Sequence, residues 1–598
     1  MKWSDKLYVA FGLGIVLYLG LLFAPVVYGE GNLFVKLKQA VELFKTPLAI
    51  QLIPETPKLL LLLCGLYGFA LLVYGSTRGN RHIGEEYGSA KWGNPKSLCR
   101  KYADRTFQKN RLLTQNVRIS TTGRPIRINQ MSLVLGGSGT GKSYFYAKPN
   151  LLQANTSYIV LDPAGELVAA TGNFLEEEGY KVRVLDLAEP ERSWHYNPFW
   201  YLRKEADILR LVKSLFQATV PKDSKSSDPM WDNLAEILCV AYVALLYDFG
   251  SPEEKNMRTL MWISQEDTIE EDENGGVKEN AIMAFFQMIE QRDPEHLAVK
   301  AYKSATKGAA KTRLSVQATL QGRLEKFNLE SVCRMTDYDE LELAQIGMEK
   351  TALFLVIPAE DTSMNFMISM LYGQLFPLLY ETAKKSPGLK LPEPTHILMD
   401  EFSNVKVPDE FMTYLTTGRK HQISFSILIQ SISQLEKMYP KSEYETLIGN
   451  CDQFLYLGSN EHKTQKLISE WMGKETIQVK TSNISKGRNG QYSENEQKIA
   501  RNLLEPDEVD TQIGEEYAIL KIRGNRFVLD KKIDPKKHPN YARSADGAGT
   551  RFLYGNAQLD ARIQETTEVR EADLEINLNF LSKEKLETVV TLSLYDEE

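Results

Sequence analysis

The stretch Leu135–Tyr144 reads LGGSGTGKSY, and it decides the fold of the region around it. Residues 136–143 match the pattern G-x-x-x-x-G-K-[ST]; the run MSLVL before them predicts a buried strand, and the residues that follow predict a helix. A glycine turn in this setting can surround phosphate oxygens with backbone N–H groups, and the positive end of the helix favours the same anion. The sequence therefore predicts a phosphate-binding loop formed by Gly136, Gly137, Ser138, Gly139, Thr140, Gly141, Lys142 and Ser143.

Two carboxylates could complete this loop into a hydrolytic site. The run THILMDEF predicts a strand that ends in Asp400 and Glu401, at the edge where open α/β sheets keep their sites. Lys142 can reach the β- and γ-phosphate oxygens of ATP, and the Ser143 hydroxyl can bind Mg²⁺. We expect Asp400 to hold the Mg²⁺ shell and Glu401 to polarise the attacking water. The alternative is a pair of surface acids after an edge strand.

Three further side chains are candidates for the same chemistry. Gln430 ends the predicted strand SFSILIQ, where it could sense the γ-phosphate or simply cap the strand. Motor ATPases that work as multimers commonly complete the site with an arginine from the neighbouring subunit. Arg419 in TTGRKHQ and Arg313 in AAKTRLS are candidates for this role, and a surface salt bridge is the alternative for each.

The order of strand-like and helical runs predicts the architecture. Strands alternate with helices on both sides of the glycine loop, which predicts an α/β fold with a mostly parallel sheet covered on both faces. From about residue 202 to 327 strand signals are nearly absent. We therefore expect a membrane anchor at 1–78, a nucleotide-binding domain at 79–201 and 328–535, an all-α insertion domain at 202–327, and a polar C-terminal tail at 536–598.

Two apolar runs predict two transmembrane helices, at about residues 8–28 and 58–76. The second run is slightly short, and Lys58 could snorkel at its end. Charges in the loop between them give a weak positive-inside signal, so the nucleotide site decides the orientation. Both chain ends are expected in the cytoplasm, with a short loop outside, as a two-span protein of the cell membrane. A cleaved signal peptide is the alternative for the first run.

Composition excludes several classes of protein. The net charge of −7 argues against a surface coated in basic residues, although a local basic channel is compatible with it. The five cysteines are scattered and form no CxxC pair, so neither a disulfide framework nor a metal-site spacing is present in the sequence. A run of basic residues could track a phosphate backbone or form a solvated helix face; its members are Lys300, Lys303, Lys307, Lys311, Arg313, Arg323 and Lys326.

The C-terminal third ends in polar sequence. EYAILKIRGNRFVLDKK predicts a closing hairpin around Gly524 and Asn525, whereas the polar residues 480–497 predict a mobile segment. From about Pro539 onward large apolar clusters are few, which predicts a tail of low order that is partly helical near residues 582–590.

Taken together, these motifs resemble the type IV secretion coupling proteins, the TraG-type branch of the FtsK/HerA motor ATPases. The resemblance covers roughly residues 1–530 and rests on the glycine loop together with VLDPAGEL, YNPF, DPMWDNLAEILC, AAKTRLSV, MDEFSN, GRKHQISFSILIQSISQL and GNCDQFLYLGS. Ala164 is a departure, because the family often has lysine at this position.

The resemblance implies a cytoplasmic RecA-like P-loop ATPase, as a homo-hexamer, at the inner mouth of a conjugation or secretion channel. It implies Lys142 and Ser143 as Walker A, Asp400 and Glu401 as Walker B, Gln430 as a family motif residue, and a finger segment that contains Arg419. It further implies that the helical insertion recognises the substrate, a relaxase joined to single-stranded DNA. ATP and Mg²⁺ are the expected cofactors, and channel subunits the expected partners.

Two other functions fit the same sequence. The first is a double-stranded DNA pump of the FtsK kind, which would need no relaxase and no helical insertion. The second is a docking platform whose ATP site controls assembly without motor activity. Protein substrates without DNA are also compatible with the sequence.

Overall fold

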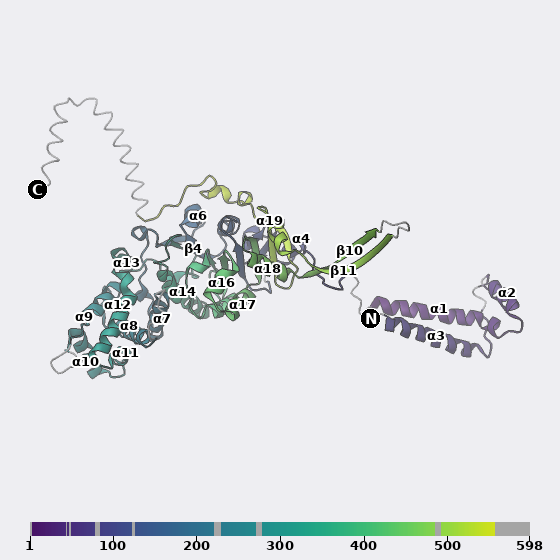
Figure 1. Cartoon of the computed structure of the whole chain (residues 1–598), viewed down its shortest axis with the longest axis horizontal. Coiled ribbons are helices and arrows are strands. Elements are labelled where there is room, and N and C mark those ends of the chain that lie inside the picture. The colour runs from purple at the N-terminus through teal and green to yellow at the C-terminus, as the bar shows by residue number, and fades with distance from the viewer. Residues whose placement is uncertain are drawn as a thin grey trace, which may run out of the picture. The chain divides into compact units, whose positions relative to one another are not determined.

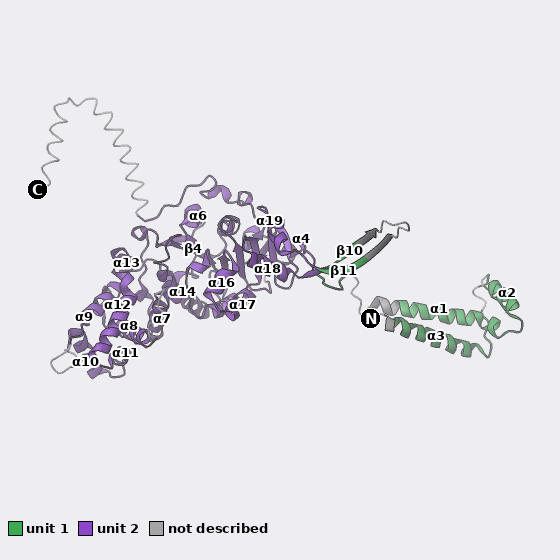
Figure 2. Cartoon of the chain, viewed as in Figure 1, with its two compact units in different colours: residues 1–89, 476–500 green, residues 90–475, 501–598 purple. Residues whose placement is uncertain are grey.

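A computed structural model describes residues 3–43, 45–46, 50–77, 84–121, 126–220, 229–270, 278–484 and 492–555. The chain forms two compact units (Figure 2). One contains residues 1–89 and 476–500, and the other contains residues 90–475 and 501–598.

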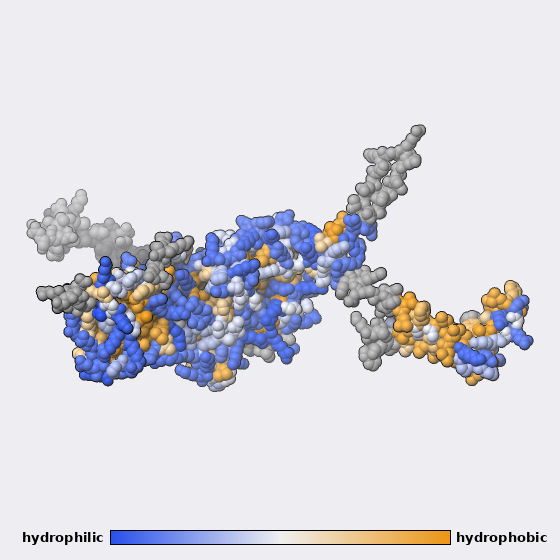
Figure 3. Space-filling view, turned by 60° about the horizontal axis from the view of Figure 1, so that its bottom comes forward, coloured by the Kyte–Doolittle hydropathy of each residue, from blue (hydrophilic) through white to orange (hydrophobic). Residues whose placement is uncertain are grey.

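The first unit contains the apolar N-terminal helices α1 (Trp3–Tyr28) and α3 (Thr56–Thr77), with α2 (Leu33–Leu43) between them in the chain. Helices α1 and α3 pack along each other, and Gly20 permits the close approach because a Cβ there would lie 2.6 Å from Leu60 Cδ2. Their outer apolar side chains are exposed, among them Phe11 and Leu61, and Figure 3 shows this apolar surface. In water such a surface is unfavourable, which favours a membrane setting.

Three helices in the described part of the chain are long and apolar enough to cross a membrane: Tyr8–Tyr28, Thr56–Tyr74 and Met230–Phe249. Only 22% and 11% of the first two are buried, whereas 56% of the third is buried. The third lies in α8 (Pro229–Phe249), where Cys239 and Tyr242 are enclosed by other helices. We therefore assign α8 to a protein core, since a helix that is apolar all round can also be a buried core helix.

Strands β10 (Lys474–Ile484) and β11 (Tyr492–Asn502) form a two-stranded sheet. The prediction of a mobile segment at 480–497 is therefore wrong for residues 480–484 and 492–497, while 485–491 lie outside the described residues. Lys480 and Glu496 form an ion pair of 2.9 Å across this sheet. Polar side chains were no obstacle to a strand here, because strand pairing uses backbone groups and opposite charges such as Lys480 and Glu496 can pair across the sheet.

The second unit is built on a sheet of nine described strands in the order β13-β12-β9-β3-β8-β7-β4-β6-β5 (Figure 1). The seven strands from β9 to β5 are parallel, and β12 and β13 add an antiparallel edge. The predicted α/β class with a parallel-rich sheet is confirmed, as is the closing hairpin of β12 and β13. In chain order the strands are β3 Met131–Gly136, β4 Ser157–Pro163, β5 Lys181–Asp186, β6 Thr351–Ile357, β7 Thr395–Met399, β8 Ile423–Ile429, β9 Gln453–Gly458, β12 Tyr517–Ile522 and β13 Val528–Lys531.

Alternate residues of these strands enter two cores, one on each face of the sheet. Leu133 and Leu135 of β3 belong to one core, whereas Val134 belongs to the other. Helices cover both faces, so the strands are apolar throughout rather than alternating with polar residues. The covering helices include α6 (Glu166–Glu177), α14 (Phe366–Lys385), α16 (Ile432–Met438) and α18 (His462–Met472).

Between β5 and β6 the described chain contains helices and no strand. Helix α7 packs against α14 of the sheet domain, and α8 packs against α11 and α12 (Figure 1). This arrangement joins the helical region to the sheet through an apolar core. The helices are α7 Glu205–Ala218, α8 Pro229–Phe249, α9 Met257–Glu266, α10 Ala281–Arg292, α11 Leu297–Thr306, α12 Ala310–Leu324 and α13 Glu330–Met335.

The predicted tail of low order is wrong at its beginning. After β13 the chain continues with defined contacts to residue 555, where the description ends. Phe552 is buried against α6, and Tyr554 donates a hydrogen bond to Asp186 Oδ2 (2.6 Å). Residues 556–598, including the predicted helix near 582–590, lie outside the described residues.

Asp267 is a buried carboxylate that joins several helices of the helical region. Its oxygens accept hydrogen bonds from Tyr242 Oη (2.5 Å), Tyr302 Oη (3.1 Å) and Asn280 Nδ2 (2.8 Å). A buried charge is tolerated only when such donors satisfy it. Asp267, at the C-terminus of α9, therefore connects the start of α10 with the middle of α8 and of α11.

We predict that Asp267→Ala lowers the free energy of unfolding by about 3 kcal/mol, because it leaves the buried hydroxyls of Tyr242 and Tyr302 without an acceptor. Urea unfolding followed by circular dichroism measures this loss. Glu279→Ala, at an exposed neighbouring position, is the control and should change stability by less than about 0.5 kcal/mol. An Asp267→Ala loss as small as that of the control would contradict this role.

Candidate functional site

The glycine loop lies at the carboxyl end of β3 and leads into a helical turn, η2 (Ser143–Ala147), that continues as α5 (Lys148–Leu151). Gly139 and Gly141 have φ angles of +76° and +81°, which side chains rarely adopt. A Cβ on Gly136 would lie 2.4 Å from Thr140 Oγ1. The glycines are therefore required by the backbone path, as a phosphate-binding loop needs.

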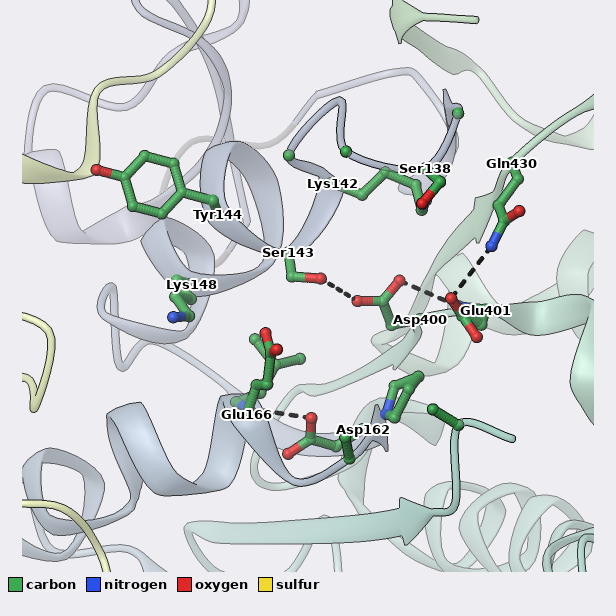
Figure 4. A pocket seen from close by; sticks show the side chains of 17 residues that line it. Ser138, Lys142, Ser143, Tyr144, Lys148, Asp162, Glu166, Asp400, Glu401 and Gln430 are labelled. Atoms are coloured by element: carbon green, nitrogen blue, oxygen red, sulfur yellow. Dashed lines mark hydrogen bonds between the residues drawn. The ribbon is translucent and has the colours of Figure 1, made fainter. Parts of the chain in front are cut away.

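Ser143 and Asp400 meet across the sheet edge. The Ser143 hydroxyl donates a hydrogen bond of 2.6 Å to Asp400 Oδ2 (Figure 4). Lys142 Nζ donates to the carbonyl oxygen of Gly136 at 2.9 Å, so the lysine folds back over its own loop. Burial raises the pKa of Asp400, opposed by the Ser143 hydrogen bond and the Lys142 charge, and burial lowers the pKa of Lys142.

Glu401 follows Asp400 in a left-handed conformation with φ +52°, unusual for a residue with a side chain. Its carboxylate accepts hydrogen bonds from Gln430 Nε2 (3.2 Å) and Asn404 Nδ2 (2.9 Å). Strand β8 lies between β3 and β7, which brings Gln430 to the space between the loop and the acid pair. Asn404 is not among the site residues predicted from the sequence, although its position three residues after Glu401 was a signal.

A cavity of about 470 Å³ lies among these residues. Figure 4 shows Gln430 and Glu401 on one side of it and Tyr144 and Lys148 on the other. The glycine loop forms part of the wall. The remaining wall comes from the end of β4, the turn after it and the start of α6, which contribute residues 162–164, 166 and 167, and from Ala359 after β6.

Asp162 is a second buried acid of this cavity that the sequence analysis missed. Its oxygens accept the backbone N–H groups of Leu167 (3.0 Å) and Val168 (2.8 Å), which holds the start of α6. Burial raises its pKa to about 7, and the charge of Asp400 adds to the shift. Ala164, with φ +61°, turns the chain toward Glu166, so the departure from the family's lysine lies in the cavity wall.

Ser143 and Asp400 fit a Mg²⁺ ion that is also coordinated by a bound ligand. Among the described residues no group of three or more His, Cys, Asp and Glu side chains could hold a metal ion. Ser143 and Asp400 nevertheless offer hard oxygen donors side by side. Mg²⁺ usually takes one or two protein oxygens and completes its shell with water and phosphate oxygens. The donor set therefore suits a metal–phosphate ligand.

The two arginine candidates lie elsewhere. Arg419 precedes β8, at the opposite end of that strand from Gln430, and its Nη2 donates to the carbonyl oxygen of Ile126 at 2.7 Å. Arg313 lies in α12, where its Nε is buried and has no hydrogen-bond partner. Neither arginine lines the cavity of its own chain.

The predicted basic run does not form one free face. Lys300 pairs with Glu295 at 2.5 Å, Lys303 pairs with Glu290, and Arg323 pairs with Asp232 at 2.7 Å while it is buried. Lys326 Nζ donates to the carbonyl oxygen of Ser363. Carboxylates therefore pair with three of the seven basic side chains, which favours a solvated helix face over a track for a phosphate backbone.

Comparison with known proteins extends this description. Residues 90–534 match the family described as Type IV secretory system Conjugative DNA transfer. The chain is 21% identical over 411 residues to Protein VirD4 of Rhizobium rhizogenes, covering 67% of this chain and 58% of the relative. It is 22% identical over 404 residues to the type IV secretion system-coupling protein VirD4 of Bartonella quintana (strain Toulouse), covering 66% and 60%. The matches thus span less than two thirds of these relatives.

Solved structures with a similar fold include the unbound monoclinic form of the bacterial conjugative coupling protein TrwBdeltaN70. The TM-score is 0.54 at 16% identity, over 74% of this chain and 93% of that one. Plasmid coupling protein TrwB in complex with ADP and Mg²⁺ gives a TM-score of 0.53 at 17% identity, over 74% and 93%. At these identities the likeness establishes the fold.

The raised pKa of Asp162 predicts a pH dependence of stability. In the folded chain the Asp162 carboxyl keeps its proton up to about pH 7. In the unfolded chain the same carboxyl loses its proton near pH 4. The folded state therefore binds more protons between these values, and stability falls as pH rises through this window, by at most about 1.4 kcal/mol per pH unit.

We expect Asp162→Asn to remove this slope. Thermal unfolding of both proteins at several pH values between about 4 and 8 measures the difference. The wild type should lose stability relative to the variant as pH rises. Parallel curves for the two proteins would contradict a buried protonated Asp162.

Proposed function

Because the chain belongs to the family of type IV secretory system conjugative DNA transfer proteins, we propose that it is a membrane-anchored ATPase that drives substrates into a secretion channel. The observation that carries the proposal is the cavity in which Lys142, Ser143, Asp400, Glu401 and Gln430 come together. ATPases that act as motors combine a phosphate-binding loop, a pair of acidic residues and a polar side chain near the γ-phosphate.

We assign the following roles in this cavity. The loop and Lys142 hold the phosphates of ATP, and Ser143 and Asp400 hold Mg²⁺, which neutralises charge on the phosphates when bound. Glu401, already oriented by Gln430 and Asn404, accepts a proton from the attacking water. Structures of TrwB with ADP and Mg²⁺, and with the non-hydrolysable ATP analogue ADPNP, support this choice of cofactors.

Residues 1–78 are proposed as the anchor, with α1 and α3 as two spans and both chain ends in the cytoplasm. The exposed apolar side chains of both helices support this arrangement. The helical insertion at 202–327 is proposed to recognise the substrate, a relaxase joined to single-stranded DNA or a protein. The mechanical unit is proposed to be a homo-hexamer that receives its channel partners at the membrane face.

Arg419 is proposed to act in the site of a neighbouring subunit. It is exposed, and it lies at the opposite end of β8 from Gln430, so it could serve a site only across a subunit boundary. An arginine at the transferred phosphoryl group stabilises charge that develops in the transition state.

We predict that Glu401→Gln keeps ATP binding but lowers ATP turnover at least about 100-fold, because the attacking water loses its proton acceptor. Transfer of a marked plasmid by cells that carry this variant should be lost, while the protein stays folded and membrane-bound. Glu443→Gln, an exposed change on α17 (Lys441–Asn450), is the matched control. Normal transfer by Glu401→Gln would favour a docking platform over a motor, and turnover stimulated by double-stranded DNA without relaxase would favour a DNA pump.

We predict that Arg419→Ala lowers ATP turnover on the order of 10³-fold at protein concentrations where subunits assemble. Lys420→Ala, at the exposed next position, should leave turnover unchanged. Mixing the Arg419→Ala protein with the Glu401→Gln protein should restore part of the activity. Where the two variants are neighbours, one subunit supplies Glu401 and the other supplies Arg419, so that one complete site forms. Unchanged turnover of Arg419→Ala in the assembled state would exclude this arginine as the finger.

A further inference from the structure

The C-terminal strap, defined as residues 535–555, is described in full although it follows the family match, which ends at residue 534. Figure 1 shows it leaving the edge strand β13 and running past α6. It contains two short helical turns, Pro535–Lys537 and Tyr541–Arg543, and is otherwise irregular. Its position is therefore fixed by contacts with other elements.

One set of contacts ties the strap to the helix that follows the glycine loop. Asp546 Oδ2 lies 2.6 Å from Lys148 Nζ, and the Lys148 side chain is only 14% exposed. Asn540 Nδ2 donates to the carbonyl oxygen of Leu152 at 2.9 Å, and a ring nitrogen of His538 lies 3.1 Å from Gln153 Oε1. The strap thus contacts the C-terminal end of the helix that begins with Ser143.

A second set ties the strap to α6. The backbone N–H groups of Ala545 and Phe552 donate to the carbonyl oxygens of Ala170 (3.0 Å) and Ala169 (3.1 Å). The Phe552 ring lies against Gly172, where a Cβ would come within 2.3 Å of it. Arg543 adds ion pairs to the end of the same helix. The strap thus connects the two helices that flank one side of the cavity.

That side of the cavity is where the nucleoside must lie. In the proposed site the γ-phosphate is next to Glu401 and Gln430, and the other phosphates lie on the glycine loop up to Ser143. The ribose and base then continue to the opposite end of the same cavity. This nucleoside end is lined by Tyr144, Lys148 and Glu166, opposite Gln430 in Figure 4.

We propose that the C-terminal strap braces the nucleoside end of the cavity, with Asp546 as a positioning residue for Lys148. Lys148 comes from one flanking helix and Glu166 begins the other, so the strap fixes both walls at once. This inference rests on the proposed nucleotide site. It adds that residues outside the family match set the affinity for the nucleoside part, while the phosphates bind independently of them.

The test measures binding of two ligands to the full-length protein by calorimetry with Mg²⁺ present. ADP occupies both ends of the cavity, whereas pyrophosphate occupies the phosphate end alone. Asp546→Ala should raise the Kd for ADP about tenfold and leave the Kd for pyrophosphate unchanged, and Asp546→Glu should restore binding. Phe552→Ala removes the anchor on α6 and should give the same result.

Arg551→Ala, an exposed change within the strap, is the control and should bind both ligands like the wild type. An unchanged Kd for ADP in Asp546→Ala overturns the proposal. An equal rise for ADP and pyrophosphate also overturns it, because the strap would then support only the general fold. A wild type that binds ADP but does not hydrolyse ATP contradicts the proposed function alone, and a wild type that binds neither ligand contradicts both.

Discussion

The hydrogen bond from Ser143 to Asp400 joins two segments that lie 257 residues apart in the sequence. It forms because β3 and β7 are separated by a single strand, β8, so the glycine loop and the acid pair end at the same edge of the sheet. Parallel strands place their carboxyl ends together, and this edge is where α/β sheets bind ligands. Every other feature of the cavity, including the orientation of Glu401 by Gln430, depends on this register.

Burial shifts the pKa values of the charged groups around this contact. Asp400 and Asp162 have raised pKa values and Lys142 has a lowered one, in each case because burial disfavours the charged form. Groups held in this way interact strongly with an incoming charge, since little water screens them. Perturbed acids and bases in a cavity are typical of functional sites, and here they surround the space proposed for the phosphates and Mg²⁺.

The sequence predicted the sheet, the glycine loop, the acid pair and Gln430, and the family match confirms the resemblance to type IV secretion coupling proteins. It failed where a segment lacks periodic apolar residues. The strap is held by backbone hydrogen bonds, by ion pairs of Arg543 and Asp546 and by the buried ring of Phe552, and the β10–β11 pair is mostly polar, so neither gives a pattern that indicates packing. The sequence left open whether the basic run is a phosphate track or a solvated helix face, in part because the partner of Arg323, Asp232, is distant in the chain.

The sequence by itself determined the local chemistry: glycines where φ is positive, apolar runs long enough for strands and membrane helices, and acids directly after a strand. These features depend on neighbouring residues, so the order of residues is enough to predict them. Only the tertiary structure decided that Asn404 and Gln430 hold Glu401, that Asp162 is buried, that α8 belongs to a core, and that Asp546 reaches Lys148. Such contacts depend on strand order and on the packing of distant segments, which no local pattern encodes.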